Sequence, residues 1–566
     1  MRPAFGYDCA GKLKRFGLRL FLTAFYCCTV LYLQDISVQT NSIFDRLQIA
    51  VENGVFFRRY FMLQLKNIKI VLKKDGRFLA DGFSFTLEKG DRAVIIGEEG
   101  NGKSTLLRFI YDPGSTDSYC ETEGEVITDC KMAYLPQVPD KRDFGKTLAE
   151  YFEGKEHYRY SALLAKLGID IKLLAPERRF GTLSGGEKVK VQLAKLCMEE
   201  PDIFLLDEPA NDLDIPALRW LEDFISCSGS PVIFVSHDET LIENTANVII
   251  HMEQLIRKTQ CKITVAHCGY IQYAENRRRS FERQDMVAQK QRDEYKKQME
   301  KWRRIYSRVE YEQRSITRQD PAGGRLLKKK MHSVKAMEKR LDRKRENFVS
   351  YSEQEDAIIV KFDEDISVPS GKTVLDYSSD VLCAGGRVLA RDIRLFVRGG
   401  EHIGITGKNG AGKTTLLNLI FRYMKEKDLF VLGYMPQNYE ELLDYAKTPL
   451  QHLAENYSKE EMTEARTLMG SMRFTGEEMT GPIGNLSGGQ KAKILFLDMV
   501  MKRAEVLLLD EPTRNFSPLS GPVIRAALRD FKGGIISISH DRKYLSEVCD
   551  TVYELGENGL RRVNLP

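Results

Sequence analysis

The sequence lacks the features that mark a membrane-spanning or metal-stapled protein. Its 566 residues contain no run of about 18 or more apolar residues, so no transmembrane helix is predicted. The 11 cysteines include no Cys-x-x-Cys pair, which argues against a zinc ribbon and against a disulfide framework. Charged residues make up 29% of the chain. We therefore expect a soluble protein of the reducing cytoplasm, large enough for two domains and a connector.

The first 61 residues do not fit that picture. Lys12, Lys14, Arg15 and Arg19 precede the apolar run 20–33, which is too short to span a bilayer and resembles the hydrophobic part of an export signal. Met62, in contrast, opens a clean strand pattern over 63–72. We expect residues 1–61 to be an N-terminal extension and native translation to start at Met62.

The rest of the chain contains an internal duplication. Three pairs of equivalent residues share one offset of 303 positions, which chance does not explain: Ser184 and Ser487, Asp207 and Asp510, and His237 and His540. Short apolar runs that alternate with helical patterns predict an α/β fold with a mostly parallel sheet in each copy. The predicted domains are residues 62–274, a helical linker over 275–355, and residues 356–566.

Each copy carries a P-loop, Gly97-Glu-Glu-Gly-Asn-Gly-Lys-Ser104 and Gly407-Lys-Asn-Gly-Ala-Gly-Lys-Thr414. The glycines let backbone N–H groups close around phosphate oxygens, the lysine reaches the β- and γ-phosphates, and the hydroxyl binds Mg²⁺. The motifs therefore predict ATP and Mg²⁺ as cofactors. The predicted ATP-binding residues are Gly97, Gly100, Gly102, Lys103, Ser104 and Thr105 in the first copy, and Gly407, Gly410, Gly412, Lys413, Thr414 and Thr415 in the second.

An Asp-Glu pair ends a predicted buried strand in each copy. Asp207 and Asp510 can hold the Mg²⁺ shell, and Glu208 and Glu511 can polarise the attacking water. Upstream, a Ser-Gly-Gly turn opens a helix whose N–H groups can face an anion. Its predicted ATP-binding residues are Ser184 and Gly186 in the first copy, and Ser487 and Gly489 in the second.

Together the P-loop, Leu-Ser-Gly-Gly, Asp-Glu-Pro and a later Ser-His-Asp resemble ATP-binding cassette ATPases. The resemblance implies a head-to-tail sandwich, in which each nucleotide lies between the P-loop of one cassette and the signature of the other. It also implies Gln137 and Gln437 as ligands of ATP and Mg²⁺, and His237 and His540 as catalytic sensors of the γ-phosphate. Site one would combine Lys103, Ser104, Gln137, Asp207, Glu208 and His237 with Ser487 and Gly489; site two would combine Lys413, Thr414, Gln437, Asp510, Glu511 and His540 with Ser184 and Gly186.

The second cassette departs from the family pattern after its Asp-Glu-Pro. Ser517 stands where the family has an aspartate, whereas the first cassette keeps Asp214. We therefore expect the two sites to hydrolyse ATP at different rates. The sequence singles out no aromatic residue upstream of either P-loop for stacking on adenine.

The linker is strongly basic and has a helical pattern. Residues 277–350 contain 24 Lys and Arg against 11 Asp and Glu, a net +13 in a chain of +5. Apolar residues recur every seven positions from Phe281 to Val309, and Pro321–Gly324 is expected to break the chain before a returning helix. A helix of about 35 to 40 residues would reach roughly 50 to 60 Å. The predicted RNA-binding residues at the tip are Arg314, Arg318, Arg325, Lys328, Lys329 and Lys330; a solvated charged coiled coil is the alternative.

Tandem cassettes joined by a charged helical linker resemble the ABC-F proteins, soluble ATPases that act on ribosomes. The resemblance implies a linker that enters the tRNA exit site and touches P-site tRNA and large-subunit rRNA. It further implies a monomer with intramolecular cassette pairing and no membrane subunit. Only 46 residues separate Gln137 from Ser184, too few for an arm insertion, and this minimal layout is common among members that protect ribosomes from antibiotics.

Three other functions stay open at this point: general control of translation, the ATPase subunit of a transporter, and a DNA-acting ATPase. The short linker and the missing zinc motifs argue against the last. No residue identifies a drug.

Overall fold

The computed structural model describes residues 62–152, 177–211, 213–255, 260–315, 321–349, 362–363, 366–454 and 458–564. The expectations for residues 1–61 and for Arg318 lie outside the described residues. Within the part of the chain that is described, no helix is both long and apolar enough to cross a bilayer.

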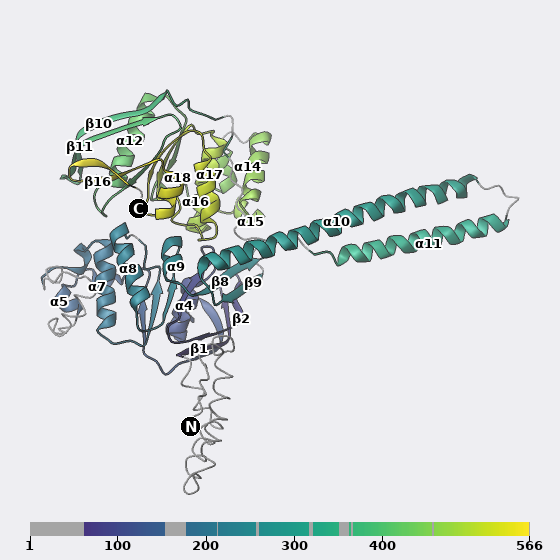
Figure 1. The fold of residues 1–566 in the computed structure, drawn as a ribbon, viewed down its shortest axis with the longest axis horizontal. Coiled ribbons are helices and arrows are strands. Elements are labelled where there is room, and N and C mark those ends of the chain that lie inside the picture. The colour runs from purple at the N-terminus through teal and green to yellow at the C-terminus, as the bar shows by residue number, and fades with distance from the viewer. Residues whose placement is uncertain are drawn as a thin grey trace, which may run out of the picture. The chain divides into compact units, whose positions relative to one another are not determined.

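The first cassette is built on a six-stranded sheet (Figure 1). Five of its strands are parallel and the last is antiparallel. Strands β6 and β7 are buried along their whole length, which explains their continuous apolar sequences. The strand order is β5(Met132–Leu135), β6(Ile203–Asp207), β7(Val232–Val235), β3(Arg92–Ile96), β8(Val248–Leu255) and β9(Gln260–Ala266).

A smaller antiparallel sheet completes this cassette, in the order β2(Phe78–Leu87), β1(Leu63–Leu72) and β4(Cys120–Ile127). The strand predicted after Met62 is thus confirmed. The helices are α4(Lys103–Tyr111), α5(Leu148–Tyr151), α7(Gly185–Cys197), α8(Ile215–Cys227) and α9(Glu239–Thr245).

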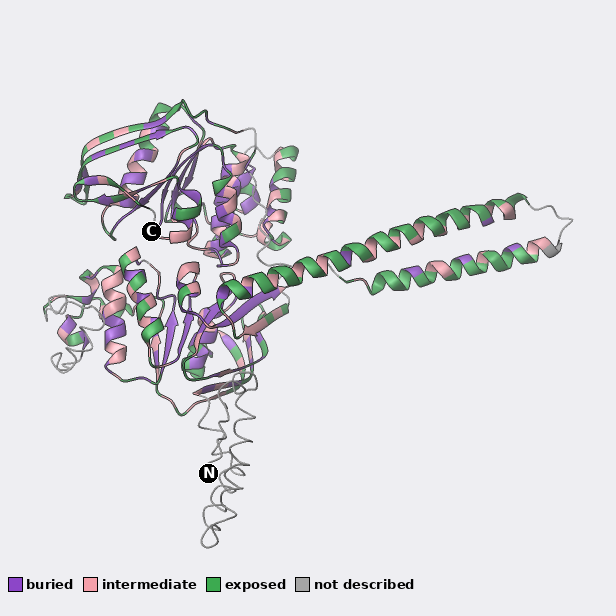
Figure 2. Ribbon diagram, viewed as in Figure 1, coloured by how far each residue is buried: buried purple, intermediate pink, exposed green. Residues whose placement is uncertain are grey.

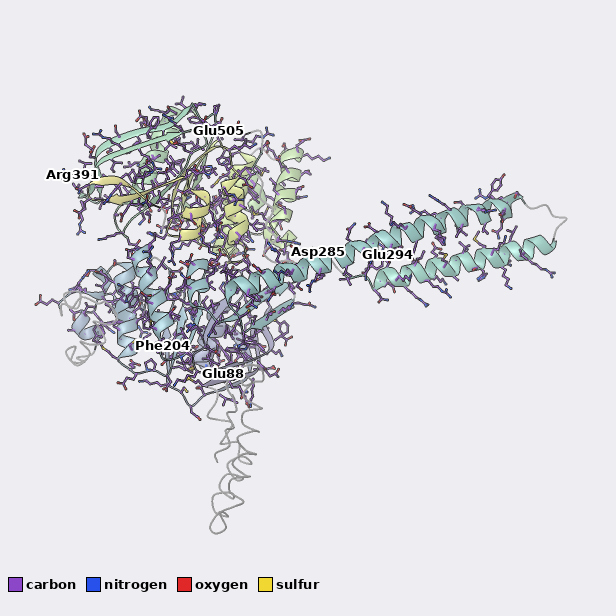
Figure 3. All side chains as sticks on the ribbon, in the orientation of Figure 1. Glu88, Phe204, Asp285, Glu294, Arg391 and Glu505 are labelled. Atoms are coloured by element: carbon purple, nitrogen blue, oxygen red, sulfur yellow. The ribbon has the colours of Figure 1, made fainter. Side chains whose placement is uncertain are left out.

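The second cassette repeats the same strand order, which confirms the predicted α/β fold of both copies. Its main sheet runs β13(Leu432–Met435), β14(Val506–Asp510), β15(Gly534–Ile538), β12(His402–Thr406), β16(Thr551–Gly556) and β17(Gly559–Val563), beside the hairpin β10(Thr373–Ala384) and β11(Arg387–Arg398). Figure 3 labels Phe204 within β6 and Glu505 directly before the equivalent strand β14. The helices are α12(Lys413–Lys427), α13(Pro449–Leu453), α14(Lys459–Ser471), α15(Gly476–Thr480), α16(Gly488–Met501), α17(Gly521–Arg529) and α18(Arg542–Val548).

The linker is a helical hairpin of α10(Tyr270–Ser315) and α11(Pro321–Glu346). Most of its surface is exposed (Figure 2). Ala288 and Val309, which lie on the predicted seven-residue seam, are buried. Trp302 Nε1 donates a 3.0 Å hydrogen bond to the Val334 carbonyl on the other helix. The apolar seam therefore holds the two helices together.

Two expectations about the linker were wrong. The first helix has 46 residues, about 70 Å at 1.5 Å per residue, because its start lies within the first cassette. Pro321–Gly324 does not break the chain but forms the first turn of α11. A proline fits there because the first helical N–H has no partner within the helix.

Candidate functional site

Both P-loops depend on glycine at their first position. Gly97 has φ +147°, and a Cβ there would lie 2.2 Å from the Met252 carbonyl oxygen. Gly407 has φ +143°, and its Cβ would lie 2.6 Å from the carbonyl oxygen of Leu555. Any side chain would push the loop off the neighbouring strand. The loops then enter α4 and α12 directly after Gly102 and Gly412.

The two P-loop lysines fold back over their own loops. Lys103 Nζ donates to the carbonyl oxygens of Gly97 at 2.9 Å and Glu98 at 3.1 Å. Lys413 Nζ makes the same contacts with Gly407 at 2.8 Å and Lys408 at 3.1 Å. Burial lowers the pKa of Lys413, and the nearby Glu511 and Asp510 partly offset this effect. Each ammonium is thus held at the loop that would receive the phosphates.

The predicted magnesium ligands meet beside the P-loops. Ser104 Oγ donates a 2.7 Å hydrogen bond to Asp207, and Tyr134 donates one of 3.2 Å to the other carboxylate oxygen. Burial raises the pKa of Asp207, and the Ser104 hydrogen bond counteracts it. In the second cassette burial raises the pKa of Asp510, counteracted by a hydrogen bond from Thr414. Sequence reasoning missed Tyr134, which lies on the strand next to Asp207.

The two glutamates that follow these aspartates share an unusual backbone. Glu208 and Glu511 have φ values of 49° and 52°, in the left-handed region that non-glycine residues rarely adopt. Each carboxyl is turned out of the end of its strand by this conformation. Strained residues of this kind cluster at functional sites.

The electrostatic surroundings of the two glutamates differ. Burial alone would raise the pKa of Glu208, but His237, whose Nε2 lies 3.1 Å from Oε1, lowers it overall. Burial and Asp510 instead raise the pKa of Glu511 to about 8. Burial also lowers the pKa of His540 to about 3. At neutral pH the first site thus holds a carboxylate and the second a protonated acid.

The signature turns form as predicted. Ser184 and Ser487 are the N-caps of α7 and α16, and each accepts a hydrogen bond from the backbone N–H three residues on. The side chains of Glu187 and Gln490 in turn accept a hydrogen bond from the backbone N–H of the cap residue, which completes a capping box. The glycines of both turns thus stand at the free N-terminal end of a helix.

A cavity of about 700 Å³ brings together the residues predicted for site two from the second cassette, but Ser184 and Gly186 do not line it, whereas His237 of site one does. It is lined from the second cassette by Gly410, Gly412, Lys413, Thr414, Thr415, Gln437, Asp510, Glu511 and His540, and from the first by Gly185, Lys188, Ala210 and Asn211. Gly185 is the residue between Ser184 and Gly186. The structure therefore brings the second P-loop to the first signature, across the two cassettes.

Site one is instead closed by direct contacts between the cassettes. His237 Nδ1 lies 2.8 Å from the Phe516 carbonyl oxygen, and Ser520 Oγ donates a 2.7 Å hydrogen bond to Glu98. The Gly489 N–H donates to the Glu99 carboxylate. Gln137 lines a separate cavity of about 220 Å³ with Asp207 and Glu208. Sequence reasoning missed Glu98 and Glu99, although both stand inside the P-loop motif.

The departure at Ser517 changes the helix that follows. Asp214 caps α8 through a 3.1 Å hydrogen bond from the Ala217 N–H. Ser517 is buried and bonds Ser520 instead, and α17 begins only at Gly521. Ser517 thus keeps the bond from the backbone N–H three residues on, although α17 begins four residues after it and α8 begins directly after Asp214.

Apolar residues of β2, β10 and β11 approach the P-loops on a side that sequence reasoning left unassigned. Ala384 and Leu389 line the site-two cavity. Leu79 takes the matching place in the first cassette, where a Cβ on Gly102 would lie 2.9 Å from its Cδ1. Phe78, the residue before it, is 36% exposed. An exposed aromatic directly before the packing leucine is the signal for a candidate adenine contact.

The described residues of the linker tip are exposed. Among the described residues Arg325, Lys328 and Lys329 form no ion pair, whereas Lys330 Nζ lies 3.8 Å from Glu312. Arg314 forms a 2.8 Å ion pair with Glu310 on the same helix. Exposed pairs of this kind are weak, so the cations remain available to a polyanion.

Comparison with known proteins places these motifs in a family. The ABC transporter family matches residues 80–211 and 390–514, one region in each cassette. The ribosome protection protein VmlR of Bacillus subtilis (strain 168) is 29% identical over 499 residues, which cover 84% of each chain. The ABC transporter F family member 2 of Arabidopsis thaliana is 26% identical over 537 residues, covering 84% of this chain and 74% of that protein.

A solved structure supports the fold. The archaeal ribosome recycling factor aABCE1, crystallised with the ribosomal stalk protein aP1, aligns with a TM-score of 0.51 at 17% identity, over 87% of this chain and 89% of that chain. Duplicated P-loops, signatures and Asp-Glu pairs now stand on matching elements of two α/β domains. The chain is therefore a tandem ATP-binding cassette ATPase, and it is similar to ABC-F proteins.

Proposed function

We propose that this protein is a translation factor whose closed, ATP-bound form binds the ribosome and whose ATP hydrolysis releases it. The observation that carries the proposal is the basic helical hairpin inserted between two ATP-binding cassettes. Residues 277–350 carry a net +13 in a chain of +5, and ribosomal RNA is a polyanion. The linker tip would lie in the tRNA exit site, near P-site tRNA and large-subunit rRNA. Such a factor works in the cytoplasm.

The predicted site residues have the following proposed roles in ATP hydrolysis. Loop N–H groups and Lys103 or Lys413 hold the β- and γ-phosphates. Mg²⁺, when bound, neutralises charge on these phosphates; its proposed ligands are Ser104, Gln137 and Asp207 in site one, and Thr414, Gln437 and Asp510 in site two.

Glu208 and Glu511 would polarise the water that attacks the γ-phosphate in line with the leaving ADP oxygen. His237 contacts both Glu208 and the opposite cassette, so it would join catalysis to closure. His540 is the equivalent sensor in site two. The neutral state of Glu511 at pH 7 supports slower hydrolysis in that site.

Charge complementarity supports intramolecular pairing of the cassettes and a monomeric protein. On the first cassette α8 and α9 present Glu222, Glu239 and Glu243, while α17 and α18 of the second present Arg525, Arg542 and Lys543. Arg525 lies 2.8 Å and Lys543 lies 2.9 Å from Glu239. Two copies of the same cassette would instead place like charges together.

Within this function, protection of the ribosome from antibiotics that bind the peptidyl-transferase centre or exit tunnel is the more specific proposal. Its support is the similarity to a ribosome protection protein over 84% of both chains. General control of translation by the same docking is the second candidate, supported by similarity to F family members at 26% identity. Growth of a sensitive strain that expresses the protein, on a panel of peptidyl-transferase inhibitors, separates the two.

Sedimentation tests ribosome binding directly. The double variant Glu208→Gln, Glu511→Gln should bind ATP without hydrolysing it, co-sediment with ribosomes and inhibit translation. The matched control adds Lys103→Ala and Lys413→Ala, which should abolish ATP-dependent sedimentation. If the double variant stays free of ribosomes in ATP, the proposal fails. Recovery with membranes instead would favour a transporter subunit.

A further inference from the structure

The two P-loops differ in charge at equivalent positions. The first contains Glu98 and Glu99 between its first two glycines, where the second contains Lys408 and Asn409. Two carboxylates within a loop that binds phosphates would repel the ligand. Contacts with other parts of the protein must therefore stabilise the two carboxylates in this loop.

Both carboxylates bond the opposite cassette. Glu99 accepts a hydrogen bond from the Gly489 N–H, in the first turn of α16. Its side chain also lies against Gly488, where an added Cβ would be 2.9 Å from Glu99 Oε2. Glu98 accepts from Ser520 and lies 3.7 Å from Lys493 Nζ. Burial alone would raise the pKa of Glu98, but Lys493 and Ser520 lower it overall, so Glu98 stays ionised.

The position of Glu99 coincides with a phosphate-binding feature. The N-terminus of α16 carries partial positive charge and N–H groups without a partner inside the helix, which stabilise an anion. In the proposed site one, the γ-phosphate of ATP binds these same groups. A carboxylate and a phosphate cannot both occupy the Gly489 N–H, since each needs the space over Gly488.

We propose that Glu99 acts as an internal substitute for the γ-phosphate in site one. In the nucleotide-free protein its carboxylate bonds the signature of the second cassette, and ATP must displace it. Glu99 thereby determines the difference in ATP affinity between the two sites, with site one the weaker. The inference rests on the proposed assignment of site one as an ATP site.

Site two has no carboxylate at the position equivalent to Glu99. Asn409, the neutral counterpart of Glu99, lines the open cavity of about 700 Å³. Lys188, Lys413 and Arg514 line this cavity together with Asp238, Asp510, Glu511 and Asp541, so it offers cations that can bind phosphates beside the carboxyl groups. Site one is closed by its own side chains, whereas site two holds an open cavity.

Nucleotide titration of the full-length protein tests the affinity. In a Lys413→Ala background, which disables site two, Glu99→Asn copies the residue of the other P-loop. We expect it to bind the fluorescent analogue mant-ATP at least ten-fold more tightly than the background. The converse change, Asn409→Glu in a Lys103→Ala background, should weaken binding to site two about ten-fold.

Hydrogen exchange tests the contact itself without nucleotide. The Gly489 amide should exchange at least ten-fold faster in Glu99→Asn than in the parent. Glu98→Gln is the control, because it keeps the Glu99 contact and should leave this amide protected. Protection that is unchanged in Glu99→Asn overturns the inference, as does mant-ATP affinity that stays the same or falls.

The Lys103→Ala variant distinguishes an error about the role of Glu99 from an error about site one. If Lys103→Ala abolishes mant-ATP binding in the Lys413→Ala background but Glu99→Asn does not tighten it, only the role of Glu99 is wrong. If Lys103→Ala has no effect on that binding, the assignment of site one is itself wrong, and the inference falls with it.

Discussion

Asn101 Nδ2 donates a 3.0 Å hydrogen bond to the carbonyl oxygen of Met252, in the middle of β8. The residues on either side of Met252 hold the base of the linker: His251 Nδ1 lies 2.8 Å from the Tyr273 hydroxyl, and Glu253 forms a 2.8 Å ion pair with Arg277. The first P-loop and α10 are thus attached to three consecutive residues. A shift of this P-loop would be transmitted to the linker through β8.

The ion pair between Arg277 and Glu253 should be important for stability. Their side chains are 10% and 3% exposed, so Arg277→Met leaves a buried carboxylate without its cation. We expect a loss of about 3 kcal/mol in the free energy of unfolding, measured by urea denaturation. Arg278→Met is the control, because Arg278 is 72% exposed in its pair with Glu282 and should cost below about 1 kcal/mol. Equal losses would contradict the prediction.

The raised pKa of Glu511 predicts a pH-dependent stability. Between its ordinary value of 4.5 and about 8, the folded protein holds a proton that the unfolded chain has released. The free energy of unfolding therefore falls by roughly 2 to 4 kcal/mol as pH rises through this window. Glu511→Gln should remove that decline. Denaturation at a series of pH values measures it.

Glu208→Gln serves as the control for Glu511, because the pKa of Glu208 is lowered. Its ionised form stabilises the folded state above pH 4.5, and that contribution is lost as pH falls through the folded-state pKa. Glu511→Gln should thus change how stability depends on pH between 4.5 and about 8, and Glu208→Gln should change it below pH 4.5. If both variants change stability over the same pH range, the difference in pKa between Glu208 and Glu511 is refuted.

The pair Arg542 and Glu222 joins α18 of one cassette to α8 of the other, and its side chains are 12% and 13% exposed. Arg542→Glu should destabilise the full-length protein by about 3 kcal/mol, because like charges then meet at a mostly buried position. Adding Glu222→Arg should recover at least half of this loss in a double-mutant cycle. Arg529→Glu, at a 56% exposed position beside Asp530, should have little effect. Absence of recovery would mean that the pair does not couple the cassettes.

The charges at the linker tip should determine how ribosome binding depends on salt. Replacing Arg325, Lys328 and Lys329 by alanine removes up to three phosphate contacts, and each contributes about 0.7 to 0.9 to the slope of log K against log salt. We expect the magnitude of this slope to decrease by about 2 to 3 when ribosome binding is measured by filter binding in the Glu208→Gln, Glu511→Gln background. Arg343, Lys344 and Arg345, exposed at the other end of α11, provide the matched triple-alanine control. If both triples lower the slope equally, the tip is not the specific contact.

Much of each cassette could be predicted from local sequence. The glycines of both P-loops, the fully buried strands before Asp207 and Asp510, and the capped signature helices α7 and α16 all appear at the predicted positions. These features depend on backbone freedom, apolar runs and caps, which a few neighbouring residues decide. The linker was predicted less well, since a proline that ends one helix can equally begin the next.

The sequence by itself determined that two ATP-binding cassettes flank a basic helical hairpin, because motif spacing and charge are properties of the chain order. Only the tertiary structure decided how the two sites differ. Glu99 meets Gly489, and His237 meets the Phe516 carbonyl, across 390 and 279 residues. Such contacts arise from the packing of one cassette on the other, and no local pattern encodes them.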